Sequence, residues 1–177
     1  MNVLVVIVNY RTPGLTIDCL KSLAPQVACV PGTQVVVTDN KSPDDSVAQI
    51  AIAINDLGIA DWCRLMPLEK NGGFAYGNNE AIKTCISAER RATSDENPSA
   101  SVAHRSSLFD LIWLLNPDTI ALPGALIELI EFMKAHPAAG IAGGRAENRD
   151  GSVRRSCFRF HSTLGELEDA LQFGPAT

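Results

Sequence analysis

The chain has 177 residues, of which 46% are hydrophobic, and its formal net charge at pH 7 is −5. This length suits one sizeable domain with a buried core, so we predict a single domain over residues 1–177. The acidic balance argues against a protein that binds nucleic acid by general electrostatic attraction. The first apolar run, Val3 to Val8, is too short to span a bilayer and has no basic start, so it predicts neither a membrane span nor a signal peptide.

The first third of the chain alternates between strand and helix signals, which is typical of an α/β domain. A β-branched strand over 3–8 is followed by Thr12-Pro13, a helix N-cap with a proline at the first helical position. A second strand covers 34–38, and a second helix begins near Pro43. The residues predicted to face the core are Leu15, Cys19, Leu20 and Leu23 in the first helix and Val47, Ile50, Ala51 and Ile54 in the second.

A third strand is predicted over 62–68, and a weaker helix over 75–86 has Ile82, Cys85 and Ile86 on its inner face. The following stretch is polar, rich in Ser, Ala, Arg and acidic residues, and almost without large apolar side chains. We therefore predict that 87–107 is a mobile surface insertion.

The sheet resumes with a short apolar run that stops at a carboxylate, Leu111 to Thr119. Such a run predicts a strand that is buried on both faces, as in the middle of a parallel sheet. Pro117 cannot donate a ladder hydrogen bond, so pairing should end near Asn116. Asp118 would then project from the carboxyl end of a central strand, where ligands bind in open α/β sheets.

The last third of the chain contains a helix, a short strand, a hairpin and a final helix. The first helix follows Pro123-Gly124 and stops at His136-Pro137. A short strand covers 139–142, and Asp150-Gly151 predicts the turn of a hairpin. The apolar stripes of the two helices are Leu126, Leu129, Ile130 and Met133 in the first and Leu164, Leu167 and Leu171 in the second, which opens at Ser162.

The five cysteines are odd in number and none are paired at C-x-x-C spacing, which indicates reduced thiols in a cytosolic protein. They are Cys19, Cys29, Cys63, Cys85 and Cys157. The histidines His104, His136 and His161 show no metal-ligand spacing, and no Ser-His-Asp or Cys-His arrangement can be assembled.

Polar clusters follow three of the predicted strands, at 9–11, 39–42 and 116–118. The carboxyl ends of parallel strands share one edge of a sheet, so these groups can converge on one crevice. Each cluster alone has an ordinary alternative, such as a turn or helix cap at Asp39-Asn40. Asp118 with a bound diphosphate could hold Mg²⁺ or Mn²⁺, although a helix cap is the alternative there too.

A glycine-rich segment over 71–79 lies between a strand and a helix. Glycines allow close approach of the backbone to a ligand, and free N–H groups near a helix start suit an anion. The segment is not G-x-G-x-x-G, so a dinucleotide site is a poor interpretation. A tight connection with no ligand is the remaining alternative.

Four motifs in this order resemble the family 2 glycosyltransferases, particularly their rhamnosyltransferase-like branch. They are Val-Val-Ile-Val-Asn-Tyr at 5–10, Thr-Asp-Asn-Lys-Ser at 38–42, Asn-Gly-Gly-Phe-Ala-Tyr-Gly-Asn-Asn at 71–79 and Trp-Leu-Leu-Asn-Pro-Asp-Thr at 113–119. The stretch at 150–156 is similar to the family's hairpin after the site. The resemblance implies the GT-A fold and a nucleoside diphosphate sugar as donor, with the sugar linked to dTDP or UDP. It also implies Mg²⁺ or Mn²⁺ as the cofactor.

The resemblance also implies which residues bind the donor. Asp39 would accept a hydrogen bond from the base, and Asp118 would hold the metal that bridges the two phosphates. Many relatives have Asp-x-Asp at this last site, whereas the first position here is Asn116, as in the rhamnosyltransferase-like branch. The complete set is Val8, Asn9, Tyr10, Asp39, Asn71, Gly73, Asn79, Asn116 and Asp118.

The family's catalytic base is an acidic residue in a later segment, which we expect to be absent from this chain. Glu168-Asp169 lies within the Leu164–Leu171 helical pattern and lacks the strand that should precede it. We therefore expect the donor-binding part of an inverting glycosyltransferase, with rhamnose the favoured sugar. The alternatives are a donor-binding fragment without transfer activity and a sugar nucleotidyltransferase, although the latter usually has a basic glycine-rich loop after its first strand.

The implied acceptor is a glycan or a lipid-linked glycan, as in cell-wall or polysaccharide biosynthesis. The expected location is the cytoplasm, with peripheral association at the inner face of the membrane left open. No nucleic-acid partner is expected.

Overall fold

The computed structural model of the chain describes residues 1–96, 109–148 and 150–154, with only the backbone considered over 88–96. It divides into two compact units, Met1–Gly140 and Ile141–Thr177. The first unit holds the main sheet and its helices, and the second holds a short hairpin.

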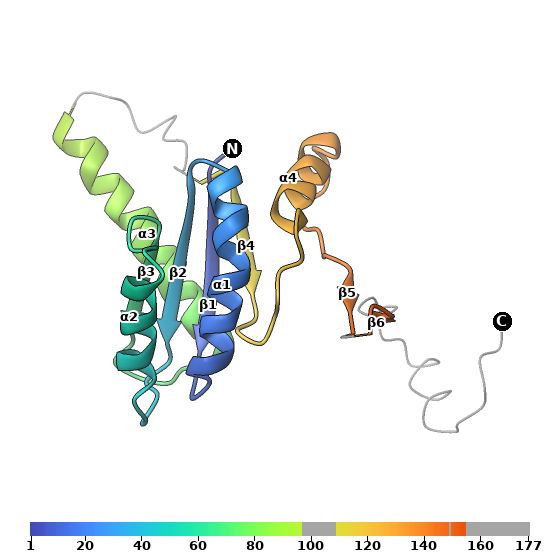
Figure 1. Cartoon of the computed structure of the whole chain (residues 1–177). Coiled ribbons are helices and arrows are strands. Elements are labelled where there is room, and N and C mark those ends of the chain that lie inside the picture. Colours follow the sequence, from blue (N-terminus) through green and yellow to red (C-terminus); the bar gives the residue numbers. More distant parts are fainter. Residues whose placement is uncertain (97–108, 149, 155–177) are drawn as a thin grey trace, which may run out of the picture. The chain divides into compact units, whose positions relative to one another are not determined.

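The first unit is built on a sheet of four parallel strands in the order β3 (Cys63–Pro67), β2 (Thr33–Asp39), β1 (Val3–Asn9) and β4 (Leu111–Leu115) (Figure 1). The register aligns Asn9 with Asp39 and Asp39 with Pro67, so the carboxyl ends of these strands are level. The predicted α/β class with a parallel sheet is confirmed, and all four predicted strands of this unit's sheet are present.

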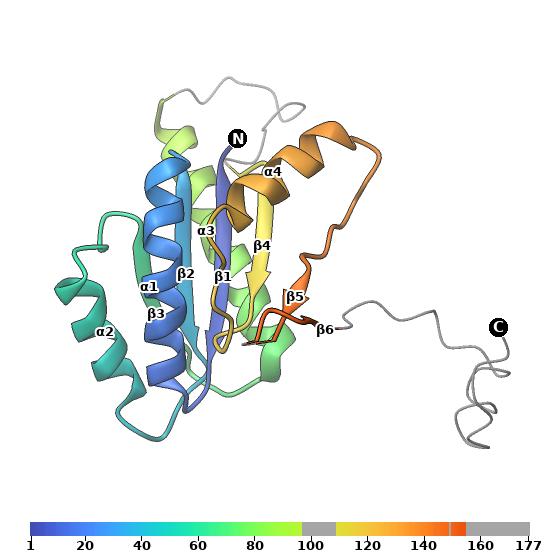
Figure 2. The ribbon, with the colours of Figure 1, turned by 45° about the vertical axis from the view of Figure 1, so that its right-hand side comes forward.

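Helices cover both faces of the sheet. Figures 1 and 2 show α1 (Pro13–Cys29) and α2 (Ser46–Asp56) on one face and α3 (Gly73–Glu96) on the other. Successive side chains of a strand point to opposite faces, so β1 supplies both layers. Val3, Val5 and Ile7 pack toward α1 and α2, whereas Leu4 and Val6 pack toward Ala81 and Cys85 of α3.

The inward faces of the first two helices are largely those predicted. Cys19, Leu20 and Leu23 of α1 are buried, as are Ile50 and Ile54 of α2. The prediction was wrong for Leu15, which is 47% exposed. Thr16 takes the inward position in the first turn of α1, and Leu15 lines a cleft at the carboxyl ends of the strands.

Helix α3 is longer than predicted, because it begins at Gly73 and runs to Glu96. Its first part packs on the sheet through Ala81 and Cys85. The first ten residues of the predicted insertion, 87–96, are therefore helical. Helix formation there needs no apolar stripe once the packed turns before it have formed the nucleus. The remainder of that segment, 97–107, lies outside the described residues.

Strand β4 does not occupy the central place predicted for it. Within the described part of the chain it pairs with β1 alone and forms an end of the four-stranded sheet. Ile112 and Leu114 are 45% and 49% exposed, although their register partners Leu4 and Val6 are fully buried. Helix α3 packs on β1 and β2 and leaves these two β4 side chains open. The prediction of a strand covered on both faces was therefore wrong for the described residues.

Helix α4 (Ala125–Ala135) confirms the stripe predicted after Pro123-Gly124, with Leu126 and Ile130 buried. It ends at His136, as predicted, and the His136 ring stacks on Phe132. The strand predicted over 139–142 is not formed, although the structure describes all four residues. Alanine and glycine offer little apolar surface there, and Ile141 is 93% exposed.

The second unit confirms the predicted hairpin. Strands β5 (Ala146–Glu147) and β6 (Val153–Arg154) pair in antiparallel fashion around Gly151, whose φ of +80° suits glycine. The predicted helix from Ser162, the pair Glu168-Asp169 and Cys157 all lie outside the described residues. The other four cysteines form no disulfide with one another. No helix in the described ranges is both long and apolar enough to cross a membrane.

Candidate functional site

The carboxyl ends of β1, β2 and β4 and the first turn of α3 enclose a cleft of about 530 Å³. It lies at the sheet edge where the polar clusters were predicted to meet. Its lining residues are Val8, Tyr10, Thr12, Leu15, Asn40, Asn71, Gly73, Phe74, Asn116, Pro117 and Asp118. Residues far apart in sequence are thus brought to one site by the parallel strand order.

The structure brings six of the predicted site residues to the cleft and leaves three out. Those that line it are Val8, Tyr10, Asn71, Gly73, Asn116 and Asp118. Asn9 and Asp39 are buried beneath the strand ends, and Asn79 is exposed on α3 without lining the cleft.

Apolar and aromatic side chains contribute to the lining of the cleft. Tyr10 and Phe74 are 44% and 50% exposed, and Leu15 is 47% exposed. Exposed aromatic faces of this kind can stack on a flat ring, and their area is favourable to bury against a ligand.

A group of amides shapes the wall between β2 and α3. Asn40 Nδ2 donates to Asn71 Oδ1 at 2.8 Å and to the carbonyl oxygen of Gly73 at 3.1 Å. The N–H of Gly72 donates to Asn40 Oδ1 at 3.3 Å, and the N–H of Gly73 donates to Asn71 Oδ1 at 3.0 Å. Asn40 therefore fixes the loop that leads into α3, and this explains why both amides border the cleft.

Two glycines of the 71–79 segment are required for packing. A Cβ at Gly77 would lie 2.8 Å from Val8 Cγ1 and 3.2 Å from Thr38 Oγ1, so only glycine allows α3 to approach the ends of β1 and β2 this closely. Gly73 has a φ of +82°, which an L side chain rarely adopts. The glycines thus serve helix–sheet contact and a left-handed turn at the cleft wall.

Asn9 and Asp39 form a polar network under the cleft. They are 0% and 1% exposed, and Asn9 Nδ2 donates to Asp39 Oδ2 at 2.7 Å. Ser42 adds a backbone N–H to Asp39 Oδ1 at 2.8 Å and a hydroxyl to Asp39 Oδ2 at 2.7 Å. Both carboxylate oxygens of Asp39 thus have protein donors, and its predicted contact with a base stays a prediction.

Asp118 differs from Asp39 in its surroundings. It is the charged side chain among the residues that line the cleft, and its carboxylate makes no hydrogen bond or ion pair with any group the structure describes. It lies near Cys19 of α1. Burial raises the pKa of the Cys19 thiol to about 12, and the negative charge of Asp118 adds to that rise.

The donor set at Asp118 suits a cation that is also bound by a ligand. The described residues contain no group of three or more His, Cys, Asp or Glu side chains able to hold a metal by themselves. Mg²⁺ is commonly bound by one or two carboxylates together with phosphate oxygens and water. One open carboxylate beside a cleft fits that pattern, with the amide oxygen of Asn116 as a second oxygen on the same wall.

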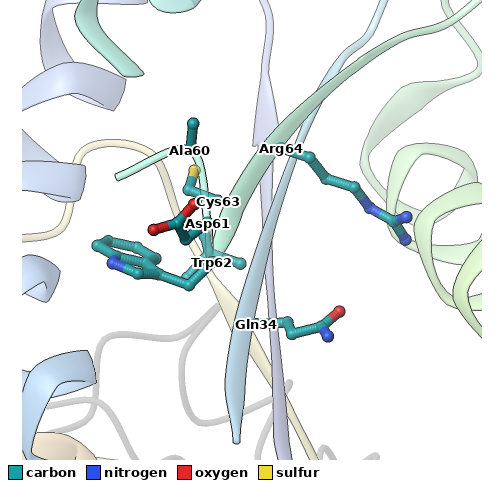
Figure 3. Close-up of a pocket in the computed structure, with 7 residues that line it drawn as sticks. Gln34, Ala60, Asp61, Trp62, Cys63 and Arg64 are labelled. Atoms are coloured by element: carbon teal, nitrogen blue, oxygen red, sulfur yellow. The ribbon is translucent and has the colours of Figure 1, made fainter. Parts of the chain in front are cut away.

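A smaller cavity of about 120 Å³ lies around the start of β3. Figure 3 shows Trp62 and Arg64 pointing to opposite sides of the strand. The lining of this smaller cavity includes Asp61 and Gln34 and none of the predicted site residues. It is at the amino ends of the strands, away from the edge where open α/β sheets bind ligands.

Five cleft residues were not predicted as binding residues. Asn40 and Pro117 each adjoin a predicted residue, and Phe74 lies within the 71–79 motif. Thr12 and Leu15 were assigned to a helix cap and a core stripe, respectively. On a helical wheel Leu15 lies at the edge of the face formed by Cys19, Leu20 and Leu23, so the sequence pattern alone could not show that it lines a cleft.

The fold is similar to that of solved glycosyltransferase structures. S. aureus TarS 1–349, TarS 1–349 in complex with UDP-GlcNAc and TarS 1–349 in complex with UDP each match with 21% sequence identity and a TM-score of 0.54. Each match covers 77% of this chain and 32% or 33% of the TarS chain. The similarity confirms the predicted GT-A fold class.

The chain spans about a third of the length of these TarS structures. No protein-family model matches it, and no curated protein matches it either.

Proposed function

We propose that the cleft binds a nucleoside diphosphate sugar and that the chain is the donor-binding part of a glycosyltransferase. The observation that carries the proposal is the cleft at the carboxyl ends of β1, β2 and β4, which joins exposed aromatic rings, fixed amides and one open carboxylate. These three kinds of group match the base, the sugar hydroxyls and the charged diphosphate of such a donor. The GT-A fold supports the proposal.

The cleft divides chemically into two parts. Tyr10, Leu15 and Phe74 offer apolar area for a base and ribose, and the amides of Asn40 and Asn71 also line the cleft. Asp118 and Asn116 supply oxygen atoms at the end of β4. We place the base near the aromatic side chains and the diphosphate near Asp118.

A diphosphate beside Asp118 would need its charge offset, because carboxylate and phosphates repel each other. We propose that Asp118, with Asn116 beside it, holds Mg²⁺ or Mn²⁺. A divalent ion bound there supplies charge neutralisation for the leaving nucleoside diphosphate. Asp118 would hold that ion beside the diphosphate, and the apolar side chains Tyr10, Leu15 and Phe74 exclude water from part of the cleft.

The finer specificity is proposed from the sequence motifs. They favour the rhamnosyltransferase-like branch of family 2, a dTDP- or UDP-linked donor and an inverting transfer to a glycan or lipid-linked acceptor. Cell-wall or polysaccharide biosynthesis, a cytoplasmic location and peripheral membrane association are part of the same proposal. TarS was solved with UDP-GlcNAc and with UDP, so both compounds belong in the first set of ligands to test.

A thermal-shift panel tests the proposal. The chain is heated with UDP, dTDP, GDP and their common sugar derivatives, each with and without Mn²⁺. A ligand present at 100 times its dissociation constant should stabilise the fold by about 2.7 kcal/mol. We expect the largest shift for a pyrimidine nucleoside diphosphate with Mn²⁺. If none of these compounds shifts the midpoint under either condition, the proposal is wrong.

A further inference from the structure

We propose that Asn9 and Asp39 are positioning residues, which hold Tyr10 and Asn40 on the cleft wall and do not touch the ligand themselves. The inference rests on the proposed function, since Tyr10 and Asn40 border the cleft assigned to the donor. Neither Asn9 nor Asp39 lines the cleft, and both side chains are sealed from solvent. Their influence must therefore pass through the turns in which they lie.

The amide of Asn9 connects three segments. Its Nδ2 donates to Asp39 Oδ2 at 2.7 Å, which links β1 to β2. Its Oδ1 accepts from the Thr12 N–H at 3.2 Å, the Thr12 hydroxyl at 3.1 Å and the Thr16 hydroxyl at 3.0 Å. The same side chain thus joins the ends of both central strands to the first turn of α1.

The two turns tied by this network share a left-handed residue at the same place. Asn9 and Asp39 are register partners at the strand ends, and each is followed two residues later by a left-handed residue, Arg11 with φ 59° and Lys41 with φ 57°. Non-glycine residues keep such a conformation where their surroundings over-determine it. The Arg11 N–H donates to Ser42 Oγ at 2.9 Å, so the first turn is also bonded to the second.

Tyr10 and Asn40 each lie between a network residue and a left-handed residue. The backbone N–H of Asn40 also donates to the carbonyl oxygen of Asn9 at 2.9 Å. The position of each cleft side chain is therefore set on both sides by bonds that end at Asn9, Asp39 or Ser42. A loosened network would displace Tyr10 and Asn40 together while Asp118, on β4's side of the cleft, keeps its place.

One exchange restores the bond between positions 9 and 39. Both oxygens of Asp39 accept from N–H donors, so an amide at position 39 would place its NH₂ against Asn9 Nδ2 or against the Ser42 N–H. A carboxylate at position 9 would instead face the Asp39 carboxylate. Changing both residues at once gives an amide that donates from position 39 to a carboxylate at position 9 and still accepts from the Ser42 N–H. The Ser42 hydroxyl, which donates to Asp39 Oδ2 in the wild type, then accepts from the new NH₂.

The test is a mutant cycle of Asp39→Asn, Asn9→Asp and the double variant, with Asp18→Asn as matched control. Asp18 is an exposed α1 residue paired with Lys21, so its change removes the same charge away from the network. Binding of UDP with Mn²⁺, and of uridine alone, is measured by calorimetry well below the thermal midpoint of each variant. Circular dichroism verifies that each variant is folded.

We expect each single variant to bind both UDP and uridine at least tenfold more weakly and the double variant to bind within about threefold of the wild type. The ratio of UDP affinities with and without Mn²⁺ should stay the same, because Asp118 is untouched. A merely structural role would lower the midpoint and leave the affinity of the folded protein unchanged.

The outcomes separate the two proposals. A wild-type chain that binds neither UDP nor uridine overturns the proposed function and this inference with it. Wild-type binding that both folded single variants retain overturns the positioning role alone, as does a double variant that stays weak. If a single variant does not fold, Ser42→Ala replaces it. That change removes the hydroxyl bonds to Asp39 and Arg11 and keeps the Asn9–Asp39 bond, so weaker uridine binding is expected and unchanged binding contradicts the inference.

Discussion

The ends of β1 and β2 and the end of β4 reach the same cleft but differ in how their polar side chains are bonded. Asn9 and Asp39 at the first two ends are buried and bonded to each other and to Ser42. Asn116 and Asp118 after β4 are exposed, and Asp118 has no hydrogen-bond or ion-pair partner within the described ranges. The same residue types therefore serve structure at one place and remain available for a ligand at the other.

The difference follows from desolvation. A carboxylate that is buried loses its hydration, which hydrogen bonds from the protein must replace, and Asp39 accepts three. Such a side chain has little capacity left for a ligand. Asp118 keeps its solvent and its lone pairs, so a cation can bind there without first breaking protein contacts. The contrast predicts that a change at Asp118 will weaken binding with little effect on stability, whereas changes in the Asn9–Asp39 network will affect both.

The largest expected effect is on binding, from Asp118→Ala. Loss of the open carboxylate should weaken Mn²⁺-dependent UDP binding at least a hundredfold, about 2.7 kcal/mol. The free energy of unfolding should change by no more than about 0.5 kcal/mol, because an exposed and unbonded side chain is lost. Calorimetry and urea unfolding measure the two quantities. If Asp118→Ala binds UDP with an unchanged dependence on Mn²⁺, or is clearly less stable than the wild type, the contrast between the end of β4 and the end of β1 is contradicted.

The next effect is on stability, from Gly77→Ala at the contact between α3 and the β1 and β2 ends. The new Cβ would lie 2.8 Å from Val8 Cγ1, so the helix or Val8 must shift. We expect a loss of about 2 kcal/mol in the free energy of unfolding, which is typical of overpacking. Weaker UDP binding should accompany it, because Val8 also lines the cleft.

Gly14→Ala is the control for this change. A Cβ at Gly14 in α1 would meet no heavy atom within 4 Å. Alanine is the better helix former by about 1 kcal/mol, so this variant should be as stable as the wild type or more so. Equal losses from both glycine variants would contradict the packing argument for Gly77.

The sequence was sufficient to predict the elements and their meeting point, because these follow from local patterns. Short apolar runs predicted the four strands of the sheet, and the parallel order then brought 9–11, 39–42 and 116–118 to one edge. It was less informative about which neighbour of a polar pair lines the cleft. Asn40 lines it, whereas Asp39 is turned inward toward Asn9, and the predicted contact of Asp39 with a base stays a prediction.

The predictions that were wrong concern segments whose burial depends on packing against distant parts of the chain. Leu15 fits an apolar helical stripe, but only the sheet's position shows that Thr16 faces inward. The apolar run at 111–115 looked like a central strand, since hydrophobicity does not reveal which faces are covered. Ile112 and Leu114 are apolar and about half exposed. In the 139–142 segment only Ile141 favours a strand, and the segment pairs with no strand in the described structure.

A smaller effect on stability is expected from Thr16→Val, which keeps the shape of a fully buried side chain and removes its hydroxyl. That hydroxyl donates to Asn9 Oδ1 at 3.0 Å or to the Thr12 carbonyl oxygen at 3.1 Å. We expect urea unfolding to show a loss of about 1 kcal/mol, the usual net value of one buried hydrogen bond.

The same substitution at the β4 end, Thr119→Val, provides the matched control. No side-chain hydrogen bond of Thr119 exists among the described residues, and the backbone bond from its N–H to the Asn116 carbonyl oxygen is retained. Its effect should stay within about 0.5 kcal/mol. If Thr119→Val lowered the free energy of unfolding as much as Thr16→Val, the ends of β1 and β4 would not differ in the contribution of their side-chain hydrogen bonds to stability.

The smallest expected effect is that of the Asp118 charge on the pKa of the buried Cys19 thiol. Burial and the Asp118 charge together raise the pKa of Cys19 to about 12, whereas burial raises that of Cys63 to about 12 without Asp118. Asp118→Asn removes the negative charge, so the Cys19 pKa should fall slightly and its thiolate fraction at pH 10 should rise. We expect about a twofold faster alkylation of Cys19 relative to Cys63, since the thiolate is the reactive form.

Peptide mass spectrometry after iodoacetamide treatment gives both rates in one sample. Cys63 serves as the internal control, because any general loosening of the fold would expose both thiols. An unchanged Cys19-to-Cys63 ratio would show that solvent screens Asp118 fully from α1. A ratio that rises as expected would mean that the open carboxylate still acts on the interior, so a cation bound at Asp118 should shift the Cys19 rate in the same direction as the substitution does.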